Sequence, residues 1–244
     1  GDYLYAWSSG LSSGTLKNFL RYKFRGDGGG LTTTEWETLP EIPTYAYKGI
    51  LVDSDPTVTP SSPSSEQLYL FSAGHYSDMP LKFNTTTLKW NVINNRAVGL
   101  PHYGGRLVSD GAGNIYGTAG YATNPFYHYS IANDVWTAKT VAPFTIYYGS
   151  DLAYTPGYVY AIRGYNTTDF ARYIIDSNTW QTLTPTPTPT PNTGVQYGGS
   201  LVAVGEDLYA IPSGGTSYFW KYTKSTESWS TSFITMQSFV TGWK

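Results

Sequence analysis

The sequence predicts an all-β protein built from repeated four-stranded sheets. Its 244 residues include 23 Tyr, 8 Trp and 26 Gly, a composition that favours short strands and tight turns over helices. Trp recurs at intervals of 54, 46, 44 and 49 residues, at Trp36, Trp90, Trp136, Trp180 and Trp229. Each interval also contains the alternation and turn signals of several strands. A period near 50 residues with four strands per repeat is typical of a β-propeller, whose blades are antiparallel sheets.

The third repeat shows the order of strands most clearly. Two short apolar strands flank a glycine-rich turn, a Tyr-rich strand follows, and an Asn-Asp turn leads into the strand that carries Trp136. We name these strands A, B, C and D in this order. They are predicted at residues 105–109, 114–120, 126–129 and 135–137.

The other repeats follow the same order. Strands A to D are predicted at 49–52, 68–71, 81–83 and 90–92, then at 151–154, 158–161, 172–175 and 180–183, and then at 200–203, 208–211, 219–222 and 229–230. The first repeat has strands B, C and D at 3–7, 19–24 and around Trp36, with no strand A before them. The chain is therefore predicted to be one domain with blades at 1–43, 44–97, 98–143, 144–191 and 192–236, and with a closing strand at 237–244.

This succession resembles the kelch repeat over essentially the whole chain. Kelch repeats carry a Gly-Gly doublet after strand B, which is present here only as Gly214-Gly215. The other repeats have Ser9-Gly10, Ala73-Gly74, Ala119-Gly120 and Arg163-Gly164 at this place. The resemblance implies a divergent kelch-like propeller of five blades. Kelch-type copper oxidases need a Tyr-Cys crosslink, which this chain cannot form because it contains no Cys.

The first blade needs a strand A from elsewhere, and three alternatives are open. In the first alternative, the C-terminal segment closes the ring in the same molecule. In the second, the sequence is part of a longer tandem array. In the third, a neighbouring molecule donates the strand. Repeated donation in one direction would build a filament. The residues predicted to take part in closure or assembly are Tyr3, Leu4, Tyr5, Phe239, Val240 and Trp243.

Charge and composition exclude several functional classes. The chain has 15 Lys+Arg against 17 Asp+Glu and only 13% charged residues, where about 25% is usual. Without a clustered excess of basic residues it is not expected to bind nucleic acid or an anionic membrane surface. The absence of Cys excludes disulfides and thiolate metal sites. No run approaches the roughly 20 apolar residues of a membrane-spanning helix.

Two tracts rich in Pro, Ser and Thr interrupt the repeats, at residues 55–65 and 184–191. Proline cannot donate a ladder hydrogen bond, so both tracts are predicted to be solvated connections. O-glycosylation is the alternative for the second tract, at Thr184, Thr186, Thr188 and Thr190. Asn84 and Asn166 begin Asn-x-Thr sequences and are candidate N-glycosylation sites. With the start at Gly1 and the absence of Cys, these signals indicate an extracellular or cell-surface protein.

Motifs for catalysis or metal binding are weak. The G-x-S-x-G string at residues 10–14 falls in a loop between β-strands, whereas a hydrolase nucleophile requires a strand-to-helix turn. His75, His102 and His128 lack the spacing of a local metal pair. We therefore predict no catalytic residue, no metal site and no cofactor.

One group of residues suggests a binding site. In a propeller the B–C and D–A connections open on the same face, and aromatic or imidazole side chains occur repeatedly in them. They are Tyr47, His75, His102, Tyr121, Tyr147 and Tyr165. Aromatic rings stack on the C–H face of a sugar. The alternative is that these tyrosines pack between blades, as the strand-B tyrosines and the repeated Trp residues are expected to do.

The sequence thus predicts a non-catalytic extracellular module that interacts with copies of itself, as a filament or surface-layer subunit, or with other surface proteins. The first alternative is a glycan-binding propeller. The second is a propeller enzyme acting on carbohydrate, with dispersed acids such as Asp78, Asp110 and Asp169 as candidates.

Overall fold

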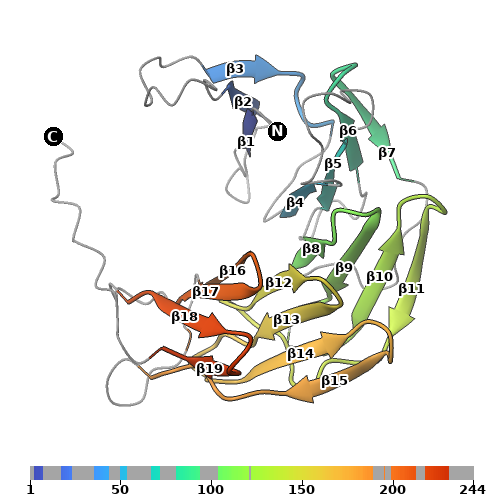
Figure 1. The fold of residues 1–244 in the computed structure, drawn as a ribbon. Coiled ribbons are helices and arrows are strands. Elements are labelled where there is room, and N and C mark those ends of the chain that lie inside the picture. The colour runs from blue at the N-terminus through green and yellow to red at the C-terminus, as the bar shows by residue number, and fades with distance from the viewer. Residues whose placement is uncertain are drawn as a thin grey trace, which may run out of the picture. The chain divides into compact units, whose positions relative to one another are not determined.

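A computed structural model of the chain (Figure 1) describes residues 3–7, 18–23, 36–43, 50–53, 67–71, 81–93, 104–120, 122–188, 195, 199–212 and 218–230. Within these ranges every regular element is a β-strand, and none is a helix. The prediction of an all-β protein is therefore confirmed. The chain divides into two compact units, which are described separately: the first holds Gly1–Leu100, Gly111–Ile115 and Tyr129–Trp136, and the second holds Pro101–Asp110, Tyr116–His128 and Thr137–Lys244.

The strands form antiparallel sheets in which each strand pairs with the next along the chain. The first sheet has three strands, β1 (Tyr3–Trp7), β2 (Phe19–Lys23) and β3 (Trp36–Leu39). The second has four strands, β4 (Ile50–Asp53), β5 (Gln67–Phe71), β6 (Leu81–Asn84) and β7 (Lys89–Val92). The register of the first hairpin pairs Tyr3 with Lys23 and Trp7 with Phe19. The strands predicted in the first two repeats are thus present, and among the described residues no fourth strand pairs with β1.

The remaining three sheets have four strands each. The third contains β8 (Leu107–Ser109), β9 (Asn114–Thr118), β10 (Phe126–Ser130) and β11 (Val135–Lys139). The fourth contains β12 (Asp151–Thr155), β13 (Tyr158–Ile162), β14 (Phe170–Ile174) and β15 (Thr179–Thr182). The fifth contains β16 (Ser200–Val204), β17 (Asp207–Ile211), β18 (Trp220–Thr223) and β19 (Ser228–Trp229). In the second unit, the first strands of successive sheets are neighbours, since β12 contacts both β8 and β16.

The same aromatic cluster, which we call the aromatic joint, links consecutive sheets at three places. A Phe from strand C stacks on the strand-B Tyr of its own sheet and meets an aromatic ring and the repeated Trp of the following sheet. The members are Tyr5, Phe19, Phe83 and Trp90; Tyr116, Phe126, Tyr173 and Trp180; and Tyr160, Phe170, Tyr222 and Trp229. The Phe-to-Trp ring centroids are 5.0 Å apart in all three joints.

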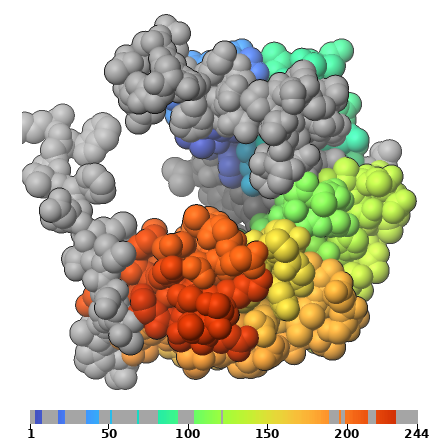
Figure 2. Space-filling model, in the orientation of Figure 1, coloured from blue at the N-terminus to red at the C-terminus, as the bar shows by residue number. Residues whose placement is uncertain are grey.

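Each joint buries its Phe completely, since Phe19, Phe126 and Phe170 are all 0% exposed. The space-filling view shows the fourth and fifth sheets, coloured yellow to red, in direct contact (Figure 2). Six of the residues predicted to pack between repeats therefore take part in these joints, namely Tyr5, Tyr116, Tyr160, Trp90, Trp180 and Trp229, whereas Trp36 is 45% exposed.

The Trp of each joint also donates a hydrogen bond to the segment that follows the last strand of the preceding sheet. The indole Nε1 of Trp90 donates to the carbonyl oxygen of Pro40, at 3.0 Å. The indoles of Trp180 and Trp229 donate to the carbonyl oxygens of Thr140 and Thr184, at 2.9 and 3.1 Å. In each case the acceptor lies four residues after the Trp of the preceding repeat. At these three places the repeated Trp therefore links neighbouring sheets both by ring packing and by a hydrogen bond.

The turns between strands C and D share one unusual backbone conformation. The residue two positions before Trp has a positive φ in the four such turns described, at Leu88, Asp134, Asn178 and Glu227, with values from 49° to 55°. In two of them the strand-C tyrosine donates to this residue, from Tyr129 to Asp134 at 2.6 Å and from Tyr173 to Asn178 at 2.7 Å. In the second repeat both partners are apolar, since Phe83 and Leu88 occupy these places. In these three turns, therefore, a strand-C Tyr occurs together with a polar acceptor, and a strand-C Phe occurs together with an apolar residue.

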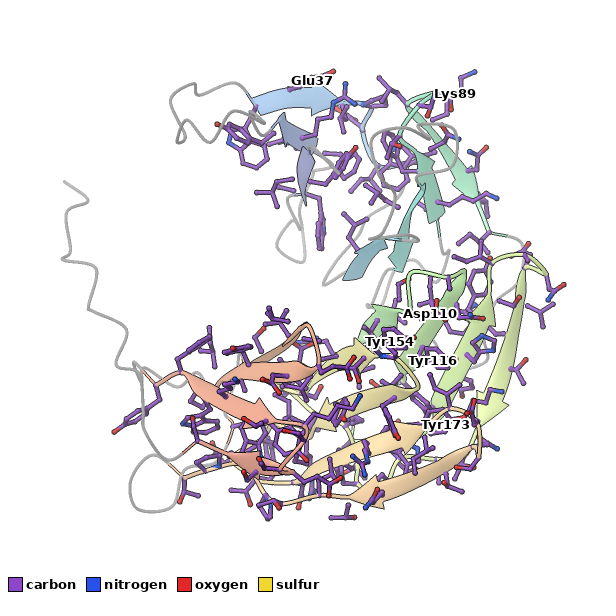
Figure 3. The ribbon with its side chains drawn as sticks, viewed as in Figure 1. Glu37, Lys89, Asp110, Tyr116, Tyr154 and Tyr173 are labelled. Carbon is purple, nitrogen blue, oxygen red and sulfur yellow. The ribbon has the colours of Figure 1, made fainter. Side chains whose placement is uncertain are left out.

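Tyrosine ionisation is expected to destabilise the fold at high pH. Burial, followed by the charge of Asp110, raises the pKa of Tyr116 to about 12, and burial raises the pKa of Tyr173, which lies near it between the third and fourth sheets (Figure 3). Burial, followed by the charge of Glu227, raises the pKa of Tyr222 to about 12. These groups stay neutral in the folded chain while the unfolded chain loses its protons near pH 10. The stability they contribute is therefore complete below pH 10 and is lost as the pH rises from 10 to 12.

Urea unfolding between pH 9 and 12, combined with phenolate absorbance near 295 nm, measures this effect. We expect the free energy of unfolding to fall above pH 10, with the last tyrosines ionising only as the chain unfolds. Complete ionisation near pH 10 in a chain that stays folded would contradict it. The Tyr222→Phe variant is the control, because it should show a smaller loss of stability over the same pH range.

Candidate binding and assembly sites

The structure brings two of the predicted binding residues together. The rings of Tyr147 and Tyr165 meet edge to face, with centroids 4.4 Å apart and an interplanar angle of 66°. The ring of Tyr148 lies nearly perpendicular to that of Tyr147, with centroids 4.9 Å apart and an interplanar angle of 88°. The other four predicted residues lie outside the described residues; they are Tyr47, His75, His102 and Tyr121.

The backbone holds Tyr165 at the surface in a strained conformation. Tyr165 and Asn166 have φ values of 53° and 60°, a region that side chains disfavour. The amide of Tyr165 donates to the carbonyl of Tyr148 at 2.9 Å, and the amide of Asn166 donates to the carbonyl of Val195 at 2.8 Å. These two bonds fix the loop between β13 and β14 against the segments that precede β12 and β16. The Tyr165 side chain remains 49% exposed.

Gly164 allows this close approach of the two segments. A Cβ at Gly164 would lie 2.3 Å from the carbonyl oxygen of Tyr148 and 2.5 Å from backbone atoms of Gly149 and Ser150. Gly164 also has a φ of 76°, and Gly120 has 77° at the same place in the third repeat. The glycine after strand B, which the kelch resemblance singled out, is thus required by the backbone at both places.

An ion pair lies close to the two tyrosines along the chain. Nη1 of Arg163 is 2.8 Å from Oδ2 of Asp169, and Nη2 of Arg163 donates to Oγ1 of Thr145 at 3.3 Å. Arg163 and Asp169 are 32% and 46% exposed. Since Arg163 is two residues before Tyr165 and Thr145 is two residues before Tyr147, two neighbouring segments supply both the rings and the polar groups. The structure therefore gives Asp169 a structural partner.

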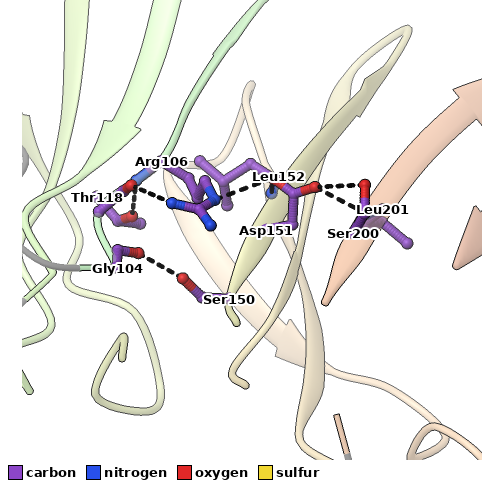
Figure 4. A network of polar contacts seen from close by, with 9 residues as sticks. Gly104, Arg106, Thr118, Ser150, Asp151, Leu152, Ser200 and Leu201 are labelled. Carbon is purple, nitrogen blue, oxygen red and sulfur yellow. Dashed lines mark hydrogen bonds and ion pairs between the residues drawn. The ribbon is translucent and has the colours of Figure 1, made fainter. Parts of the chain in front are cut away.

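A second polar network, which the sequence analysis did not identify, joins the first strands of three sheets (Figure 4). Oδ1 of Asp151 lies 3.5 Å from Nε of Arg106 at the start of β8. Oδ2 accepts hydrogen bonds from the amide of Leu201 at 2.8 Å and from Oγ of Ser200 at 3.2 Å, at the start of β16. Nearby, Ser150 Oγ donates to the carbonyl of Gly104 at 2.5 Å. Asp151 therefore connects the fourth sheet to both of its neighbours.

The repeat alignment contained a signal for this network. Arg106, Asp151 and Ser200 each stand directly before the first Leu of strand A. Opposite charges thus occupy the same position in consecutive repeats. When such strands lie side by side, equivalent positions become neighbours, so the ion pair could have been expected once the repeats were aligned.

The burial of Asp151 makes the network sensitive to pH. Its side chain is 20% exposed. Burial raises the pKa of this carboxyl, while the amide of Leu201 and the charge of Arg106 act in the opposite direction. A carboxyl with a raised pKa stabilises the fold most fully below its unfolded pKa, and that contribution is lost as the pH rises through its folded value.

The Asp151→Asn variant tests this sign. Its free energy of unfolding relative to the natural chain is expected to increase as the pH rises from about 3 to 7, because the amide never has to ionise inside the network. The control is Asp176→Asn, which removes a negative charge from an exposed turn residue. Urea unfolding at several pH values measures both. A relative stability of Asp151→Asn that decreases with pH would show that Arg106 outweighs burial.

The predicted assembly edge is in part described. β1 pairs with β2 on one side, and it is the outermost strand of the first sheet among the described residues. Tyr5 and Trp7 pack on the core formed by Phe19, Leu68 and Phe83, whereas Leu4 is 49% exposed. The C-terminal residues of the prediction, Phe239, Val240 and Trp243, lie outside the described residues.

The glycosylation candidates occupy different surroundings. Asn166 is exposed, whereas Oδ1 of Asn84 accepts hydrogen bonds from the amides of Thr86 and Thr87 in the turn between β6 and β7. Thr184 Oγ1 donates to the carbonyl of Glu227 at 3.2 Å, although the residue is exposed.

The start of the second Pro-rich tract is part of the repeat, which corrects its interpretation as a solvated spacer. Thr186 is 3% exposed, and its amide donates to the carbonyl of Thr168 at 2.9 Å. In the preceding repeat the amide of Ala142 makes the same bond to Asn124. A buried hydroxyl at Thr186 does not suit glycan attachment in the folded chain. Thr188 is exposed, and Thr190 lies outside the described residues.

Neither a model of a known protein family nor a curated protein matches the chain. Among the described residues, no three His, Asp or Glu side chains gather in a way that could hold a metal ion. The same residues contain no helix with the length and apolar character needed to cross a membrane.

Proposed function

We propose that the chain is a divergent kelch-like β-propeller of five blades that acts as a non-catalytic extracellular module and assembles with copies of itself. Its blades are the five sheets. The sequential pairing in every sheet, the contacts of β12 with β8 and β16, and the repeated aromatic joints support this arrangement. In a propeller the first strands surround the central axis, which places the Arg106–Asp151 network there.

The observation that carries the proposal is the three-stranded first sheet. Every other sheet has a strand before the one equivalent to β1. Among the described residues β1 pairs only with β2, and the outer edge strand of a sheet is a place where a further strand can add. The exposed Leu4 gives the edge an apolar contact. We propose that the incoming strand is the segment 237–244 of a second copy, so that each copy donates one strand and accepts one.

The experiment compares three forms of the chain by sedimentation velocity and electron microscopy. The natural chain should form concentration-dependent oligomers or filaments. A chain lacking residues 237–244 should be monomeric, because it cannot donate. Leu4→Lys should also weaken assembly, because a charged residue on a strand edge discourages strand addition. The control is Val141→Lys, which places the same charge at a residue that is 52% exposed and lies outside the first sheet.

A synthetic peptide of residues 237–244 provides a second measurement. If it fills the edge of β1, it should dissolve the assemblies of the natural chain, because it competes for the acceptor edge. A natural chain that is monomeric at high concentration would overturn the proposal and favour closure within one molecule. Assembly that persists in both variants would show that another surface is used.

A further inference from the structure

We propose that Tyr147 and Tyr165, together with the Arg163–Asp169 ion pair, form a binding site for a neutral sugar. This site shares no residue with the assembly edge, since all four residues belong to the second compact unit and β1 belongs to the first. The proposal therefore does not depend on self-association. We call these four residues the tyrosine site.

An exposed aromatic face is the first requirement for stacking a sugar ring. Tyr165 meets Tyr147 edge to face and not in a parallel stack. The exposed fraction of 49% agrees with this geometry. A pyranose presents a patch of C–H groups on one side of its ring, and such a patch packs favourably on the negative face of an aromatic ring.

The second requirement is that the ring is held in place before the ligand arrives. The amide of Tyr165 is bonded to the carbonyl of Tyr148, and the amide of Asn166 to that of Val195. Gly164 places this backbone too close to residues 148–150 for any side chain at its own position. A ring fixed in this way loses little conformational entropy on binding, which favours affinity. The positive φ of Tyr165 is a strained conformation of the kind found at ligand sites.

The third requirement is a set of polar groups that can bond to sugar hydroxyls. Arg163 offers several N–H donors, and Asp169 offers carboxylate acceptors. Both are partly exposed while bonded to each other, so their orientation is fixed and part of their hydrogen-bonding capacity faces solvent. Thr145 Oγ1 accepts from Arg163 and steadies it further. Because the two charges cancel, the pair favours a neutral sugar over an acidic one.

Isothermal titration against a panel of neutral and acidic oligosaccharides tests the proposal. The protein should be produced in a bacterial host so that Asn166 carries no glycan. We expect saturable binding of at least one neutral sugar, in the weak range usual for single aromatic platforms. Tyr165→Ala should weaken it at least tenfold, whereas Tyr165→Phe should bind within about threefold of the natural chain, because it keeps the ring.

Two controls separate binding from folding and from assembly. Trp36→Ala removes an aromatic residue that is 45% exposed in the first sheet, and it should leave sugar binding unchanged. The sedimentation of Tyr165→Ala should match that of the natural chain. No binding of any neutral sugar by the folded protein would overturn the proposal. Binding that is unchanged in Tyr165→Ala would overturn it too, and altered sedimentation of that variant would show that Tyr165 contacts another copy instead.

Discussion

Phe170→Ala is expected to lower the free energy of unfolding by about 3–5 kcal/mol. Phe170 is 0% exposed and lies at the centre of the joint between the fourth and fifth sheets. Its ring centroid is 4.9 Å from that of Tyr222 and 5.0 Å from that of Trp229, and it stacks on Tyr160 at 5.8 Å. Alanine would leave a cavity among three large rings that cannot easily close around it. Urea unfolding followed by Trp fluorescence measures the loss, since Trp229 reports directly on this joint.

The matched control is Phe170→Leu, which keeps most of the buried volume but loses the aromatic contacts. It should cost roughly 1–2 kcal/mol. The equivalent variants Phe19→Ala and Phe126→Ala should resemble Phe170→Ala, because their joints have the same geometry. An effect of Phe170→Ala below about 1 kcal/mol would mean that the joint is not a main source of stability.

Gly164→Ala is expected to lower the free energy of unfolding by about 2–4 kcal/mol. The positive φ of Gly164 contributes roughly 1 kcal/mol of this cost, because alanine disfavours that conformation. The remainder comes from the new methyl, which would meet backbone atoms of Tyr148, Gly149 and Ser150 at 2.3 to 2.5 Å. Backbone cannot move aside as a flexible side chain can, so overpacking adds about 1–3 kcal/mol.

Gly157→Ala provides a close control for Gly164→Ala. Gly157 has a φ of 85°, but a Cβ built there meets nothing within 4 Å. Its substitution should therefore cost only the conformational part, about 1 kcal/mol. The difference between the two variants, measured by urea unfolding, isolates the steric effect. Equal losses in both would show that the segments near Gly164 separate easily.

Strand order was predictable from the sequence because its signals are local. Apolar alternation, Gly-containing turns and the repeated Trp placed β12 and β13 within one residue of their observed ends. The boundary of β14 was less accurate: it begins at Phe170, whereas the prediction began at residue 172. Phe170 stands directly after the polar loop that contains Asp169, and nothing in the local pattern shows that its ring is the centre of a joint.

The polar contacts between sheets were less predictable. Arg106 and Asp151 meet only because their strands lie side by side. The burial of Thr186 was missed for a related reason, since the composition of a Thr-Pro tract indicates solvent exposure, whereas its place in the repeat matches that of Ala142. Of the six residues predicted to form a binding site, the described residues contain Tyr147 and Tyr165, whose rings are in contact.

The aromatic joint also bears on how such a chain can arise. The fourth sheet offers Tyr160 and Phe170 to the sheet that follows it, and Tyr173 and Trp180 to the sheet that precedes it. The fourth repeat thus carries two different halves of the joint, one for each neighbouring sheet. A duplicated repeat inserted between two others would find a matching partner on both sides at once. Each aromatic joint described involves only two neighbouring sheets, so a change in the number of repeats would not by itself disrupt a joint.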